Sequence, residues 1–229
     1  MNKINQRSIL QNMKNLIFVV FLLLFTHQAY ANRTQDLQDL EARVHHIESI
    51  WLNNHQVPKD NPKRKNIFLK LTEDITDVVL SFPKHAEPLI LKSAILLTMA
   101  EDASNFLSLG LVKEAKKLLL KAIDINPEAN HGAALVTLGV LYYKVPSWPI
   151  SFKDEDEAEF YLSKALAVNP AGIDSNYYYA DFLIDQGKEK QALPYLNKAI
   201  NVKIDPNHPD FMIQQREQHK AKLALSNLR

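Results

Sequence analysis

The segment EAKKLLLKAIDINP at residues 114–127 returns as EAEFYLSKALAVNP at 157–170 and, in shorter form, as QALPYLNKAI at 191–200. In each copy, a small residue is followed four positions later by a bulky one and three positions after that by a second small one. The three sets are Ala115, Leu119 and Ala122; Ala158, Leu162 and Ala165; and Ala192, Leu196 and Ala199. Spacings of four and three place each set on one face of a helix. Because alanines let a second helix approach closely, each copy is predicted to be the second helix of an antiparallel pair.

Residues typical of a first helix precede the second and third copies. They are Leu138, Gly139 and Tyr142 and, more loosely, Tyr179, Ala180, Leu183 and Gly187. The first two copies end at Asn-Pro, and the residue before a proline is disfavoured in the helical region. The pattern resembles the tetratricopeptide repeat (TPR), a helix-turn-helix unit of about 34 residues. This resemblance implies an all-α fold, a short TPR-like helical solenoid of about three repeats with N- and C-terminal capping helices.

The spacing of the copies predicts where the repeats are irregular. Ala158 and Ala192 are 34 residues apart, whereas Ala115 and Ala158 are 43 apart. We expect about seven of the nine extra residues in the turn between the two helices of the second repeat, at 144–156, and the other two near 128–131. The first repeat allows two registers. The preferred one has helices at 87–102 and 111–124 joined by a long turn, and the other continues the first helix through Phe106 to a tight turn at Gly110.

After its first 31 residues are set aside, the chain is divided into three regions, an N-terminal cap, the repeats and a C-terminal cap. We expect an N-terminal helical cap at 32–85, made of helices at 34–54 and 67–82 with a break at 57–66. Repeats are expected at about 86–129, 130–172 and 173–206, followed by a C-terminal capping helix at 207–229 that opens at Pro209. A solenoid needs such terminal caps because its end faces are otherwise exposed.

The first 31 residues have the features of a secretory signal. Lys3, Arg7 and Lys14 occur without acidic residues, an apolar run covers 16–25, and residues 29–31 read Ala-Tyr-Ala, an A-x-A cleavage site. Ten apolar residues are too few to span about 30 Å of hydrocarbon, which makes a retained anchor the weaker alternative. We predict cleavage after Ala31, export to the periplasm of a Gram-negative bacterium, and no stable membrane anchor afterwards.

No pattern of catalytic or metal-binding residues is found. The chain contains no cysteine, and its five glycines do not form a phosphate-binding loop. His45 and His46 are adjacent and so do not face a common point on a helix. The acidic run 154–157 is expected to cap a helix N-terminus, and the basic cluster 63–65 to be a solvated turn. With a formal charge of +1, the chain is expected to bind no nucleic acid, metal or cofactor and to have no enzymatic activity.

The long turn predicted in the second repeat is the candidate for recognition. Residues 145–152, VPSWPISF, place large apolar side chains where an ordinary repeat has about three polar residues, and two prolines stiffen the segment. Tyrosine and tryptophan offer a large contact area with a polar group at one end, so a binding surface is one interpretation and packing against a repeat edge is the other. The candidate residues are Tyr142, Tyr143, Trp148, Ile150, Phe152, Asn176, Tyr177, Tyr178 and Phe182.

A narrower resemblance rests on LGVLYY at 138–143, VPSWPI at 145–150, ALAVNP at 165–170 and GIDSNY at 172–177. These stretches are similar to exported bacterial repeat proteins related to the TRAP-transporter-associated tetratricopeptide family. That resemblance implies contact with a periplasmic solute-binding subunit and delivery of hydrophobic organic acids. Members of that family are lipoproteins, whereas this chain lacks the cysteine that a lipobox requires.

The sequence predicts a binding protein rather than an enzyme. We expect a periplasmic adaptor that holds a segment of another periplasmic or envelope protein on a concave face lined with aromatic residues. One alternative is an accessory subunit of a TRAP-type solute transporter that binds a small apolar ligand. A second is a structural scaffold of an envelope complex.

Overall fold

The structure is a computed structural model that describes residues 33–54, 57–59, 61–103, 105–145, 152–207 and 211–228. The chain divides into two units, Met1–His46 and Ile47–Arg229. Residues 33–54 are helical, so the described part of the first unit is the beginning of this helix. The predicted signal at 1–31 lies outside the described residues.

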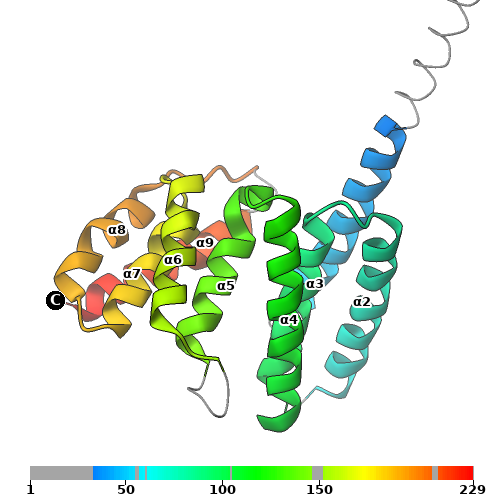
Figure 1. Ribbon diagram of the computed structural model, residues 1–229, viewed down its shortest axis with the longest axis horizontal. Helices are drawn as coiled ribbons and strands as arrows, with labels where there is room; N and C mark the ends of the chain where they lie inside the picture. Colours follow the sequence, from blue (N-terminus) through cyan, green and yellow to red (C-terminus); the bar gives the residue numbers. More distant parts are fainter. Residues whose placement is uncertain are drawn as a thin grey trace, which may run out of the picture. The chain divides into compact units, whose positions relative to one another are not determined.

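The second unit is a succession of helix pairs (Figure 1). After α2, Pro62–Ser81, come the pairs α3, Glu87–Asp102, with α4, Asn105–Ile125; α5, Ala133–Lys144, with α6, Glu155–Val168; and α7, Ile173–Asp185, with α8, Glu189–Asn201. The last helix, α9, Phe211–Asn227, packs against α7 and α8. The described residues contain no strand. The predicted all-α fold with three helix pairs and a C-terminal helix is confirmed.

The core is built on the small and bulky positions that the repeated segments predict. All nine of these alanines and leucines are fully buried on α4, α6 and α8. Gly139 shows why a first helix needs a residue without a side chain at this position, because a Cβ there would lie 2.6 Å from Cγ of Leu162 on the partner helix. The close approach of paired helices is therefore direct backbone packing.

Neither predicted register of the first repeat places the start of its second helix correctly. The first helix ends at Asp102 as preferred, but α4 begins at Asn105 and includes Gly110, so the connection is only residues 103–104. A glycine within a helix costs about 1 kcal/mol relative to alanine, which is why local sequence favours a helix boundary at this position. Packing of Leu111 and Val112 against the core offsets this cost.

The irregular spacing of the second repeat lies where the sequence predicts it. The connection between α5 and α6 covers residues 145–154, compared with 186–188 between α7 and α8. The extra residues near 128–131 form a 3-10 turn, Ala129–Gly132, in which Asn130 and His131 have φ angles of 47° and 56°. This left-handed turn lets α5 start in a new direction.

The start of α2 corrects two further predictions. It begins at Pro62 rather than 67, because the Asn61 side chain accepts a hydrogen bond from Lys63 N at 3.0 Å and proline suits the first helical position. The cluster 63–65 is not a solvated turn, since Arg64 is 3% exposed. Its guanidinium donates to Asp102 Oδ2 at 2.5 Å and to the backbone oxygens of Asn54 and Val57 at 3.0 and 2.6 Å.

Candidate partner-binding surface

The structure separates the predicted binding residues into a buried group and a partly exposed group. Trp148 and Ile150 lie outside the described residues. Phe182 and Asn176 are buried completely, so their side chains are not available at the surface. Phe182 packs in the core beside Tyr143, and the Asn176 side chain donates to the backbone oxygens of Pro170 and Gly172 at 3.0 and 2.8 Å. These two residues fix α7 and its preceding turn.

The first helices α5 and α7 are joined side by side through Asp181. Tyr143 OH donates to Asp181 Oδ2 at 2.7 Å, and Lys144 Nζ lies 3.1 Å from the same oxygen. Burial, together with the charge of Asp181, raises the pKa of Tyr143 well above its ordinary value. The phenol therefore stays protonated as a donor. Lys144 also approaches Asp185 Oδ1 at 3.7 Å, which extends the polar row along α7.

The C-terminal end of the long turn of the second repeat, its base, is held by contacts to the neighbouring helices. At its C-terminal end, Asp154 N donates to Tyr142 O at 2.9 Å, and the Asp154 side chain accepts from Glu157 N at 3.1 Å. Asp154 is thus the N-cap of α6, as predicted for the acidic run. Lys153 Nζ lies 3.9 Å from Asp185 Oδ2 on α7. The Phe152 ring stacks edge-to-face on Tyr142 with 5.6 Å between centroids.

Lys116 is a residue of this base that the sequence does not indicate. Its ammonium, which comes from α4, lies 4.4 Å from the Tyr142 ring centroid and 4.1 Å from that of Phe152. Burial lowers the pKa of Lys116, while the charges of Glu157 and Asp154 act in the opposite direction. Such a contact joins the first repeat to the turn of the second. A lysine on the preceding second helix carries no local sequence signal for this contact.

Tyr177 and Tyr178 lie at the start of α7 beside α9. Their rings are 4.8 Å apart, and Lys220 Nζ on α9 donates to Tyr178 OH at 3.3 Å and to Glu217 at 3.0 Å. Burial raises the pKa of Tyr177 to about 12, with further contributions from Asp181 and Glu217. The sequence predicts α9 only as a cap, because its apolar residues are sparse, and gives no sign of this contribution to the site.

The partly exposed residues of α5 and α7 define what we call the first-helix row: Lys144, Tyr177, Asp181, Ile184 and Asp185. Three of the five, Lys144, Asp181 and Asp185, bear charged groups that are paired within the protein, and the base of the long turn lies at one end of the row. No group of three or more His, Asp or Glu side chains that could hold a metal ion occurs in the part of the chain that the structure describes. Among these same residues, no helix is long and apolar enough to cross a membrane.

The arrangement of the second unit is that of a helical repeat scaffold, a class defined by stacked helix pairs. No family model matches the sequence, and no curated protein matches it. The fold is similar to the crystal structure of a thermophilic TPR protein of Thermus thermophilus, with a TM-score of 0.53. The two chains are 19% identical, and the match covers 86% of this chain and 94% of the other. The expected TPR-like fold is confirmed.

Proposed function

We propose that the protein is an exported, non-catalytic adaptor that holds a segment of another periplasmic or envelope protein against its first-helix row. The observation that carries this proposal is the long turn at 145–154, which is held at its base between α4, α5 and α7. Equivalent turns in the first and third pairs cover only 103–104 and 186–188. An insertion that is anchored to neighbouring helices at residues 152–154 adds a segment that a partner can contact.

The chemistry of the first-helix row supports a polypeptide as the ligand. Tyr177 offers an aromatic ring with a hydroxyl group, and Ile184 adds apolar area about two turns further along α7. Asp181 and Asp185 supply acceptors, and Lys144 supplies a donor. Stacked repeats place equivalent first helices along the concave side of a solenoid, where extended segments bind. Binding to such a row buries aromatic surface and pairs peptide groups with side chains at the same time.

Affinity capture from native periplasm tests this proposal. The wild-type chain is compared with a Trp148→Ala/Phe152→Ala variant and with Leu80→Ala, a control on α2 where the side chain is 73% exposed. We expect one protein to be recovered with the wild type and the control and to be lost from the double variant, while circular dichroism shows that all three remain folded.

The same experiment separates the alternatives. Recovery of a small hydrophobic molecule with no protein would favour the transporter accessory that the narrower resemblance implies. Equal recovery of a protein with all three chains would favour a scaffold whose contacts are spread over other surfaces, and it would contradict a role of the long turn.

The proposed export has its own test. N-terminal sequencing of protein isolated from the periplasm should give a chain that begins at Asn32. Recovery of the uncleaved chain in the membrane fraction would instead support the retained anchor.

A further inference from the structure

The second repeat carries a row of four aromatic rings, one of them the buried Tyr142, that do not belong to the first-helix row. The row begins at Phe152, whose ring lies 5.6 Å from Tyr142, and continues to Tyr161, stacked on Tyr142 at 5.7 Å with an interplanar angle of 6°. It ends at Phe160, 5.1 Å from Tyr161. This aromatic row crosses from the end of the long turn over α5 to α6. Phe160 is 49% exposed, so this end of the row presents apolar area to solvent.

Two ammonium groups and a leucine border the aromatic row. Lys116 contacts its beginning from α4, and Lys164 Nζ lies 4.2 Å from the Phe160 centroid at its end. Leu120, one turn after Lys116, is 38% exposed. Around Phe160 and Lys164, the exposed face of α6 is shallow and open and is made by Asp156, Glu159, Phe160, Ser163, Lys164 and Ala167. Apolar groups are thus exposed on both α4 and α6.

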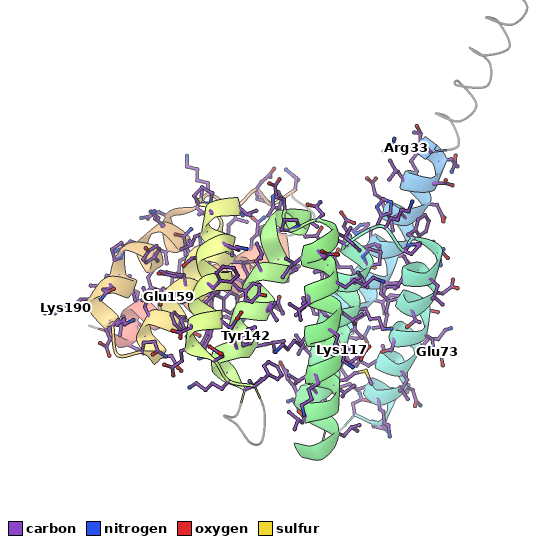
Figure 2. All side chains as sticks on the ribbon, in the orientation of Figure 1. Arg33, Glu73, Lys117, Tyr142, Glu159 and Lys190 are labelled. Carbon is purple, nitrogen blue, oxygen red and sulfur yellow. The ribbon has the colours of Figure 1, made fainter. Side chains whose placement is uncertain are left out.

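The charges on the two sides of the aromatic row have opposite sign. Between 113 and 121, α4 carries Lys113, Lys116, Lys117 and Lys121 against one acid, Glu114. Between 155 and 164, α6 carries Glu155, Asp156, Glu157 and Glu159 against one base, Lys164. Helix α5 lies between these two helices (Figure 1), and Figure 2 shows Lys117 and Glu159 on either side of Tyr142.

We propose that the face bearing the aromatic row is the interface of a homodimer, in which a second copy of the chain binds about a twofold axis parallel to α5. Such a rotation lays the basic α4 of one copy over the acidic α6 of the other, and it does so twice, as an isologous interface requires. A face whose charge is antisymmetric about its centre is complementary to itself. Two copies of a uniformly charged face would repel each other instead.

The heights of the charged side chains along the helix direction bring opposite charges together when one copy is rotated about this axis. Lys116 contacts the ring of Tyr142, and the backbone oxygen of Tyr142 accepts a hydrogen bond from Asp154 N, so Lys116 lies level with the start of α6. Each residue advances a helix by about 1.5 Å, and the rotation preserves height along the axis. Lys117 and Lys121 of one copy therefore lie at the level of Asp156 and Glu159 of the second copy.

The exposed apolar side chains complete the interface. At the same level, Leu120 of one copy meets Phe160 of the other, so an apolar contact forms inside the charged border. The first-helix row stays free in this dimer, so failure of the dimer proposal would leave the adaptor proposal intact.

Sedimentation velocity over a range of concentrations tests the dimer. We expect the wild type to associate and Phe160→Asp to remain a monomer, while the control Leu80→Asp associates like the wild type. Added salt should weaken association, because charges across the interface are screened. A wild type that stays monomeric at all concentrations would overturn the proposal, and so would a dimer that persists in Phe160→Asp.

Charge reversal gives a second test that does not depend on a destabilising substitution. Lys117→Glu/Lys121→Glu and Asp156→Lys/Glu159→Lys should each weaken self-association by about tenfold or more, because like charges then face each other. Mixed in equal amounts, the two variants should form a heterodimer, since each again meets opposite charges. Absence of the heterodimer, with both variants folded by circular dichroism, would contradict the twofold arrangement.

Discussion

Replacing two glycines by alanine gives opposite effects on stability if the helix pairs pack as described. At Gly139 the new Cβ would lie 2.6 Å from Leu162 Cγ, 3.0 Å from Leu162 Cδ2 and 3.3 Å from Ala158 O. Leu162 is fully buried and has no room to move, so overpacking costs about 1–3 kcal/mol. The higher helix propensity of alanine returns about 1 kcal/mol. We expect Gly139→Ala to lower the free energy of unfolding by up to about 2 kcal/mol.

Gly110 provides the matched control, since it also lies within a helix but a Cβ added to it would meet no atom within 4 Å. Gly110→Ala should therefore raise the free energy of unfolding by about 0.5–1 kcal/mol. Urea denaturation followed by circular dichroism measures both. If Gly139→Ala stabilised the protein as much as Gly110→Ala, the close packing of α5 on α6 would be refuted. A loss of stability in Gly110→Ala would show that α4 does not begin at Asn105.

Three further predictions concern paired polar groups. Arg64→Met should lower the free energy of unfolding by about 2–4 kcal/mol in urea denaturation, because it removes the buried charged donor that Asp102 and the backbone oxygens of Asn54 and Val57 share. Arg64→Lys should be destabilised as well, since an ammonium does not reproduce the guanidinium geometry, and equal stability of Arg64→Lys and wild type would contradict this. Tyr143→Phe should cost about 1–2 kcal/mol in the same assay by removing the hydrogen bond to Asp181, and an unchanged midpoint would show that the bond contributes nothing. The pKa of Tyr177 is about 12 in the folded protein, against an ordinary value of 10.0. Between pH 10 and 12 the native state therefore keeps a proton that the unfolded chain releases, and the free energy of unfolding falls as the pH rises. Tyr177→Phe should make this fall shallower, and an identical slope would count against the burial of the phenol.

The helix pairs could be predicted from the sequence because the residues that pack one helix on its partner recur at fixed short spacings along the chain. Alanine, leucine and alanine at intervals of four and three lie on one face of a helix, and the small alanines let a second helix pack closely against that face. The long turn at 145–154 could also be located, because inserted residues shift the spacing between Ala115 and Ala158. These predictions depend only on neighbours along the chain.

The start of α4 and the burial of Arg64 depend on contacts that are distant in sequence. Gly110 is an unfavourable helix residue, and only the packing of Leu111 and Val112 against other helices shows that the helix continues through it. Arg64 is buried because Asp102, far along the chain, supplies the opposite charge. A short window of sequence contains neither partner.

The candidate site, too, depends on contacts between residues that are distant in sequence. The sequence predicts that tyrosines on α5 and α7 gather, and Tyr143 and Tyr177 do lie near one carboxylate, Asp181. It does not give the direction of each side chain around its helix, and Asn176 and Phe182 are in the core. Lys116 reaches the site from another repeat, and such cross-repeat contacts follow from how the repeats stack.

Photo-crosslinking in living cells tests the central claim, that a partner binds along the first-helix row, most directly. A photoreactive amino acid is placed at Tyr177 in one strain and at Leu80, on α2, in another. We predict a discrete crosslinked product of one partner protein from position 177 and none from position 80. Equal labelling from both positions, or no product from position 177 while the variant remains folded, would contradict the account.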